Sequence, residues 1–187
     1  MGRPKALLPD EDGRPFVARI VRTFASAGLD RLVVVTGAQH DAIVAALAAE
    51  GLAAAVSCVR NPDPSRGQIS SLWVGMDAAV TPDLDALLMT LVDVPMVRAS
   101  TVRAVIDAWR RSRAPIVRPA IGDRHGHPVL FDRAVFDQLR RAPIDGGAKA
   151  VVHAYADRVV NVDVDDEGCL IDVDTPEDYR ALTRRQT

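Results

Sequence analysis

The chain has 187 residues, of which 48% are apolar and 4% aromatic, and its formal net charge is −2. This length and apolar content suit one globular domain with a sizeable core, and they exclude a disordered chain. The small net charge argues against a nucleic-acid partner held by bulk charge. No apolar run approaches the roughly 18 residues of a membrane span, and the start carries no signal-peptide pattern. We therefore expect a cytoplasmic protein without a membrane partner.

Helices and strands alternate along the first third of the chain. Apolar residues at helical spacing predict helices over 16–27 and 41–50, and short apolar runs predict strands over 32–35 and 53–59. The short connections between these elements predict right-handed crossovers and a mostly parallel sheet.

The rest of the chain continues the α/β pattern. The predicted strands cover 87–92, 115–120, 126–131 and 159–164. The predicted helices begin near Ser70, cover 101–109, 133–140 and 148–155, and end with one that begins at Thr175. Residues 121–125 are expected to form the turn of a hairpin. No repeat or linker interrupts the chain, so we expect a single domain over 1–187.

The opening segment Met1-Gly2-Arg3-Pro4-Lys5-Ala6-Leu7-Leu8-Pro9 is unusual for the start of a domain. Its two basic residues and its glycine suit a loop that holds a phosphate. A basic N-terminal tail without a ligand accounts for the same residues.

The strand predicted over 87–92 is followed directly by a single carboxylate, Asp93, and Pro95 cannot donate to a ladder. A nearly unbroken apolar run predicts a strand buried on both faces, as in a parallel sheet. Ligands of open α/β sheets gather at the carboxyl ends of such strands, where a carboxylate can hold Mg²⁺ together with phosphate oxygens. Alternatively, Asp93 caps the helix that begins near Ser100.

Gly67 precedes two serines, Ser70 and Ser71, at the predicted start of a helix. Either serine is a natural N-cap. A helix N-terminus after a glycine also offers backbone N–H groups to a ligand, so capping and ligand binding both stay open.

His125 and His127 would face the same side of a strand, where two imidazoles can bind a metal. No third ligand is nearby in the sequence, so we favour a structural or substrate-contact role for them.

Asp172 and Asp174 belong to an acidic cluster close to the C-terminus. Thr175 at the N-cap, Pro176 at N1 and Asp178 at N3 are strong signals for the start of a helix. Capping therefore accounts for the cluster. The carboxylates of Asp172 and Asp174 point the same way on an extended segment, however, and such a pair can complete a metal site.

Four segments together resemble the molybdenum cofactor nucleotidyltransferases, most closely the molybdopterin cytidylyltransferases. These segments are MGRPKALLP, LVDVP, GHPVLF and DVDTPEDY, with weaker support from RGQISSL and DGGAK. The resemblance runs from residue 1 to about Tyr179. It implies a three-layer α/β/α, Rossmann-like nucleotidyltransferase fold with a mostly parallel mixed sheet.

The resemblance also implies a role for each matching residue. Lys5 and Asp93 would be catalytic, and Mg²⁺ would be held by Asp93, Asp172 and Asp174. The residues implied for the nucleotide are Gly2, Lys5, Gly67 and Ser71. Those implied for the acceptor substrate are Gly126, His127, Pro128 and Asp145. Pro4 before Lys5 matches the cytidylyl group, since the guanylyl group usually has an acidic residue there.

The implied reaction joins a terminal phosphate of molybdopterin to the α-phosphorus of an NTP, with CTP favoured, and releases pyrophosphate. Positioning and charge neutralisation supply most of the catalysis in such a transfer. A GTP-using enzyme, another acceptor, or a protein that binds the pterin cofactor without transfer are the alternatives. A molybdoenzyme or a chaperone is a further partner to consider. An oxidoreductase is less favoured, because the sequence has no GxGxxG fingerprint.

The resemblance departs from the family at the start. The family opens with a strand and a glycine-rich loop that ends in an arginine just before the Met-Gly pair, whereas this sequence begins at that methionine. We expect the gene product to start upstream, and a weakened relative of the family is the alternative.

Overall fold

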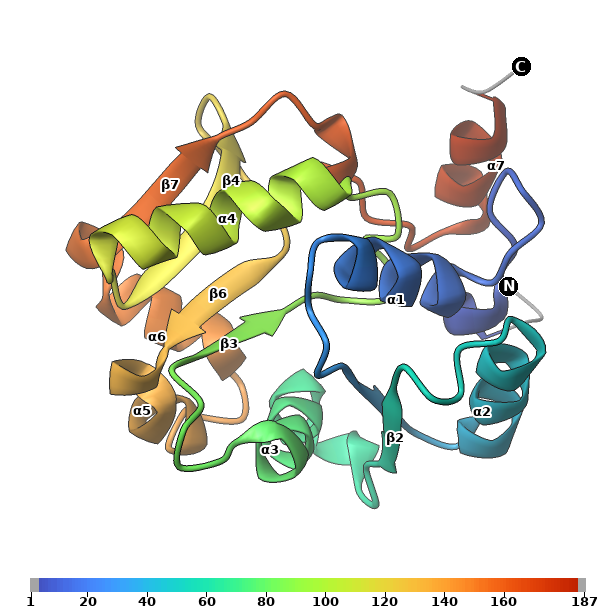
Figure 1. The fold of residues 1–187 in the computed structure, drawn as a ribbon, viewed down its shortest axis with the longest axis horizontal. Coiled ribbons are helices and arrows are strands. Elements are labelled where there is room, and N and C mark those ends of the chain that lie inside the picture. The colour runs from blue at the N-terminus through green and yellow to red at the C-terminus, as the bar shows by residue number, and fades with distance from the viewer. Residues whose placement is uncertain (1–3, 185–187) are drawn as a thin grey trace.

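The computed structural model describes residues 4–184 (Figure 1). Its strands are β1 (Val33–Thr36), β2 (Ser57–Arg60), β3 (Ala86–Met89), β4 (Ile116–Ile121), β5 (Arg124–His125), β6 (Val129–Asp132) and β7 (Val159–Asp163). Its α-helices are α1 (Phe16–Ser26), α2 (His40–Ala49), α3 (Gln68–Ala79), α4 (Ala99–Ser112), α5 (Phe136–Arg140), α6 (Gly147–Ala154) and α7 (Pro176–Arg184). Short 3₁₀ helices are η1 (Lys5–Leu7), η2 (Pro64–Arg66), η3 (Arg133–Val135), η4 (Ala156–Arg158) and η5 (Glu167–Leu170).

The described strands form two sheets. β1 and β2 pair in parallel, and the larger sheet has the order β3-β6-β4-β5, with β7 paired to β4. β4 and β7 run parallel, whereas the β3–β6, β4–β6 and β4–β5 pairs are antiparallel. The sheet is therefore mixed.

Helices cover both faces of the larger sheet, which gives the fold three layers. Ile116 and Phe131 pack into the core cluster that contains residues of α3, α5 and α6. Their neighbours Val117 and Leu130 pack against α4, which lies in front of β4 and β7 in Figure 1. Because neighbouring strand residues face opposite sides, a strand between two helical layers is apolar at consecutive positions.

A second core joins α1 and α2 to the small sheet. Val17 and Val21 of α1 pack with Ile43 and Leu47 of α2 in one buried cluster, which also includes Ala6 of η1. The N-terminal segment is thus fixed to the body of the protein by apolar contacts.

The α/β class and the three layers are confirmed, but the prediction of a mostly parallel sheet is wrong around β6. This strand lies antiparallel between β3 and β4. An apolar run indicates burial of both faces and carries no information on the direction of the neighbouring strand. β3 also ends at Met89, earlier than predicted, and the chain reaches Asp93 through a turn.

Two further predicted bounds change in the structure. Arg124–His125, expected within a turn, form β5 against β4. The helix predicted over 133–140 begins as the 3₁₀ helix η3 and becomes α-helical only at Phe136. No helix within residues 4–184 has the length and apolar content to cross a membrane.

Candidate active site

The site forms where β3 leads into the turn that carries Asp93. The C-terminal segment lies directly against this turn, because the backbone N–H of Val173 donates to the carbonyl of Asp93 over 2.8 Å. Val173 is fully buried and packs with Leu8 and Phe16. This contact brings Asp172 and Asp174, which flank Val173, to the same place as Asp93.

Lys5 completes the cluster from a third segment. Its ammonium Nζ donates to Asp174 Oδ1 over 2.5 Å and lies 3.9 Å from Asp93 Oδ2. The side chain of Lys5 is 33% exposed and that of Asp93 is 24% exposed. A cation therefore already lies between carboxylates from two distant parts of the chain.

The segment that carries Lys5 is held by the loop that follows it. The carboxylate of Asp10 is only 1% exposed. It accepts hydrogen bonds from the backbone N–H groups of Asp12 and Arg14, and it forms an ion pair with Arg19. Arg19 also donates to the carbonyl of Pro95, two residues after Asp93. Arg19 thus links the Lys5 segment to the Asp93 turn.

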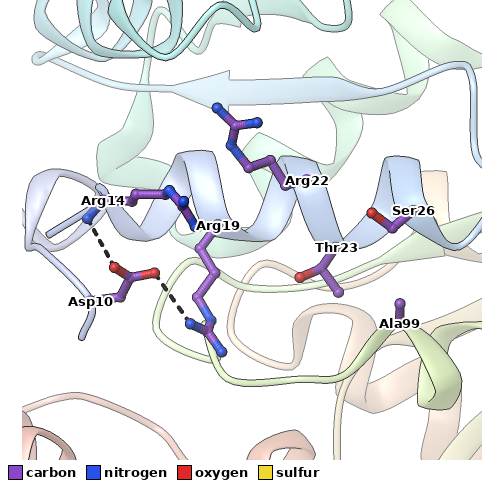
Figure 2. A pocket seen from close by; sticks show the side chains of 7 residues that line it. All are labelled: Asp10, Arg14, Arg19, Arg22, Thr23, Ser26 and Ala99. Atoms are coloured by element: carbon purple, nitrogen blue, oxygen red, sulfur yellow. Dashed lines mark hydrogen bonds and ion pairs between the residues drawn. The ribbon is translucent and has the colours of Figure 1, made fainter. Parts of the chain in front are cut away.

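Figure 2 shows Asp10 directed toward Arg14 and Arg19 in a pocket beside α1. The guanidinium groups in this pocket are already neutralised, since Arg19 pairs with Asp10 and Glu11 while Arg14 and Arg22 pair with other carboxylates. Neither Lys5 nor Asp93 lines this pocket. Because its guanidinium groups are already paired, the pocket is not a second anion site.

The electrostatics of the cluster match a site in which negative charge exceeds positive charge. Burial and the nearby charge of Asp93 raise the pKa of Asp172. Burial lowers the pKa of His127, although the Met89 backbone and the charges of Asp172 and Asp93 act in the opposite direction. Asp93 Oδ1, His127 Nδ1 and Thr90 Oγ1 are buried without a hydrogen-bond partner in the described chain.

These observations bear on whether the residues fit a divalent cation. Within residues 4–184, no group of three or more His, Cys, Asp or Glu side chains is arranged so that it could hold a metal ion, so the three carboxylates predicted to bind Mg²⁺ do not form such a site by themselves. Mg²⁺ rarely needs one, because it usually binds one or two carboxylates and takes its other ligands from waters and substrate phosphates. The unpartnered oxygen of Asp93 and the raised pKa of Asp172 are what such a partial site would show.

The capping alternative for Asp93 is wrong. α4 begins at Ala99 after the N-cap residue Arg98, and no side chain among the described residues caps it. The carboxylate that binds this end of the helix is that of Asp166, whose Oδ2 accepts from the Arg98 N–H over 2.8 Å and from the Thr101 hydroxyl over 2.6 Å. Asp93 is thus left available to the site.

The predicted start of the last helix is confirmed. The Asp178 carboxylate accepts from the backbone N–H and the hydroxyl of Thr175, and the Asp178 N–H donates back to that hydroxyl. Capping is therefore done by Thr175 and Asp178, and the side chain of Asp174 points instead to Lys5.

The segment Gly126-His127-Pro128 approaches the site from the start of β6. The His127 N–H donates to the carbonyl of Cys169, and a Cβ at Gly126 would lie 2.1 Å from that same oxygen. Only glycine allows this approach. His125 is exposed on β5 while His127 is half-buried, so the two histidines do not form a metal pair.

Gly67 and Ser71 lie on a separate segment at the start of α3. The expected N-cap is wrong: α3 begins at Gln68, so Ser70 and Ser71 lie inside the helix and Gly67 is the cap. Gly67 has φ +80°, a value that favours glycine. Both serine hydroxyls accept hydrogen bonds from the Asn61 side chain, over 2.8 and 3.0 Å.

One predicted residue, Asp145, has no contact with the acidic cluster among the described residues. Asp145 is exposed on the turn before α6 and, among the described residues, makes no side-chain hydrogen bond or ion pair. Gly2 lies outside the described residues.

Four residues that support the site were not predicted from the sequence: Asp10, Arg19, Asn61 and Asp166. Asp10 begins Asp-Glu-Asp-Gly, a composition typical of a turn in which the first carboxylate accepts nearby N–H groups. The other three act across 9 to 76 residues of sequence. No local pattern marks them.

The fold and the site together define a class. A three-layer α/β/α domain with a lysine and several carboxylates at the end of a sheet strand suits an enzyme that binds a polyphosphate and a divalent cation. The MobA-like NTP transferase domain family matches residues 1–159, and the chain belongs to that family. Its class is therefore that of the NTP-dependent nucleotidyltransferases. The match ends before Asp172 and Asp174.

The chain is also similar to individual proteins. The chain is 34% identical over 138 residues to the bifunctional protein GlmU of Burkholderia lata, spanning 71% of this chain and 28% of that protein. It is also similar to the crystal structure of Rv0371c from Mycobacterium tuberculosis, at 32% identity and a TM-score of 0.81, over 98% of this chain and 91% of that one. The same protein has been solved in complex with manganese.

A molybdopterin-guanine dinucleotide biosynthesis protein A from Archaeoglobus fulgidus shares the fold, with a TM-score of 0.67 over 98% of this chain and 91% of that one. Its sequence identity is 14%, so this likeness concerns the fold alone.

Proposed function

We propose that the protein transfers a nucleoside monophosphate from an NTP, with CTP preferred, to molybdopterin and releases pyrophosphate. The observation that carries the proposal is the position of Lys5 Nζ, 2.5 Å from Asp174 and 3.9 Å from Asp93. Lysine provides a compact point charge suited to phosphate oxygens. The family, the resemblance of GRPK to the cytidylyl group and the GHPVLF segment support the finer assignment.

In the proposed reaction, an oxygen of the acceptor's terminal phosphate forms a bond to the α-phosphorus. The bond from that phosphorus to the bridging oxygen breaks, and pyrophosphate leaves with the electron pair. Lys5 neutralises the triphosphate, and Gly67 and Ser71 contact the nucleotide from the start of α3. This leaves the protein mainly the task of positioning two anions that repel each other.

In this proposal Asp93, together with Asp172 or Asp174, would hold Mg²⁺, and the substrate phosphates would supply further ligands. When bound, the ion supplies charge neutralisation at the phosphates. The manganese complex of Rv0371c supports the use of a divalent cation. The Lys5 ammonium lies against Asp174, and we propose that it turns to the phosphates when a nucleotide binds.

The acceptor would bind on the other side of Asp93, against Gly126, His127 and Pro128, with Asp145 at the rim. The orphaned Nδ1 of His127 supports this placement, because a buried ring nitrogen without a partner is costly unless a ligand satisfies it. A pterin is rich in groups that could bond to it.

The test is to incubate the protein with each of the four NTPs, Mg²⁺ and molybdopterin, and to follow pyrophosphate release. Release that is fastest with CTP and dependent on molybdopterin is expected. If pyrophosphate is released with GTP, or only with another phosphorylated acceptor, the assignment of CTP or of molybdopterin is wrong and the nucleotidyltransferase class still holds. Calorimetry that detects pterin binding and no NTP binding would favour a cofactor-binding protein instead.

We further propose that one more strand fits between the two sheets, as the resemblance leads us to expect. Among the described strands, β1 pairs only with β2 and β3 only with β6, and both keep half-buried apolar residues. Unpaired strand edges of this kind normally receive a neighbour or a cover. Reading the coding DNA upstream in frame tests the proposal: stop codons without a strand and a glycine-rich loop would contradict it.

A further inference from the structure

Asn61 is the first residue after β2 and one of the few buried polar side chains, at 4% exposed. Its backbone N–H donates to the carbonyl of Thr36 at the end of β1, over 2.7 Å. Asn61 is therefore fixed at the carboxyl ends of both strands of the small sheet. A buried amide needs partners for its two donors and its acceptor.

All the hydrogen-bonding groups of this amide are used. Asn61 Oδ1 accepts from the Asp63 N–H over 2.9 Å, which identifies the oxygen. Nδ2 then donates to Ser70 Oγ over 2.8 Å and to Ser71 Oγ over 3.0 Å. The orientation of the amide is set by these contacts, and both hydroxyls act as acceptors toward it.

The two serines differ in what their own protons do. Ser70 is 5% exposed, and its Oγ donates to the carbonyl of Gly67 over 2.7 Å. The Ser70 proton is therefore already used in a hydrogen bond within the fold. Ser71 is half-buried, and no acceptor for its proton exists among the described residues. Because Asn61 already occupies one lone pair, the Ser71 proton is left directed away from Asn61.

We infer that Asn61 is a positioning residue that makes Ser71 a dedicated hydrogen-bond donor to an oxygen of the bound nucleotide. The inference rests on the proposed function, which places Ser71 in the nucleotide site. Without Asn61, the Ser71 hydroxyl could rotate and present a lone pair, which repels a phosphate or carbonyl oxygen. Asn61 acts through Ser71 and needs no contact with the nucleotide.

The side chain at position 61 can be changed without changing its shape. An aspartate keeps the acceptor for the Asp63 N–H but cannot donate, so it would turn the Ser71 proton inward toward the carboxylate. Asn61→Asp should thus mimic Ser71→Ala in nucleotide binding. Ser70→Ala is the matched control, since it loses a contact to the same amide and removes no donor directed to the ligand.

The experiment measures KM for CTP and kcat for the wild type, S71A, N61D, the double variant N61D/S71A and S70A, with thermal unfolding of each. A donor to a charged oxygen accounts for about a tenfold change in affinity. We expect S71A and N61D each to raise KM about tenfold with kcat within about twofold, and the double variant to be no weaker than the worse single variant. S70A should lower only the unfolding temperature.

An unchanged KM in folded N61D, or additive effects in the double variant, would overturn the inference. So would an equal rise of KM in S70A. If the wild type releases no pyrophosphate with any NTP, the proposed function fails separately. Calorimetric titration of CTP into the same variants then decides the inference on Kd alone, and absence of CTP binding to the wild type would overturn it as well.

Discussion

Asp166 joins the N-terminus of α4 to the segment that leads to the acidic cluster, and its replacement should strongly lower the free energy of unfolding. The carboxylate is 3% exposed and accepts from the Arg98 N–H, the Thr101 hydroxyl and the Gly168 N–H. Thr101 is itself 2% exposed, so water cannot replace the lost acceptor.

The magnitude for Asp166→Ala follows from these contacts. Each buried donor left unsatisfied costs about 1–3 kcal/mol. With the Thr101 hydroxyl and the Gly168 N–H both orphaned, we expect a loss on the order of 2–6 kcal/mol in the free energy of unfolding. That is a large part of the total for a typical domain.

Urea unfolding followed by circular dichroism measures this loss. Asp165→Ala is the matched control, because the neighbouring side chain is exposed and makes no side-chain hydrogen bond among the described residues, so its effect should stay within about 0.5 kcal/mol. A loss below about 1 kcal/mol for Asp166→Ala would refute the argument that this carboxylate holds the two segments together.

Three further changes test the site. Lys5→Met should lower kcat/KM by about 10²–10³-fold, as loss of a charge-stabilising donor does, while Lys149→Met, at the other lysine of the chain, should not. Gly126→Ala should destabilise the fold by about 1–3 kcal/mol in urea unfolding, because the new Cβ meets the Cys169 carbonyl at 2.1 Å. Asp172→Asn should raise Tm at pH 7 and lower activity. The raised pKa of Asp172 means that the folded state favours the neutral carboxyl more than the unfolded state does, so a stability penalty develops as pH rises from 3.8 through the raised pKa. The Tm gain should therefore vanish near pH 3, and a gain that persists there would contradict this reasoning.

Much of the fold was predictable because local patterns carry it. The spacing of Val17, Val21 and Phe24 fixes the buried face of α1, and the predicted helix differs from the observed one by one residue at its end. Thr175 and Asp178 formed the predicted cap because both partners lie within one turn. The direction of β6 was not predictable, since pairing depends on which strands meet in space.

The site was predicted in part for a similar reason. Asp93 and Asp174 could be proposed because each belongs to a recognisable segment, and the structure places both carboxylates beside Lys5. Their functional roles stay predictions. The hydrogen-bond partners of Asn61 and Arg19 could not be predicted from the sequence, because the local sequence does not show whether a polar residue is solvated or buried.

By itself, the sequence determined the α/β alternation, most helix bounds and the candidate charged residues, because hydrophobic spacing and capping act over a few residues. Lys5 and Asp174 are 169 residues apart in the sequence. The tertiary structure alone decided that their side chains lie 2.5 Å apart. It also decided that Asp166, and not Asp93, binds the residues at the start of α4. Burial and long-range contacts decide whether a carboxylate is structural or free to bind a ligand, and neither is a local property.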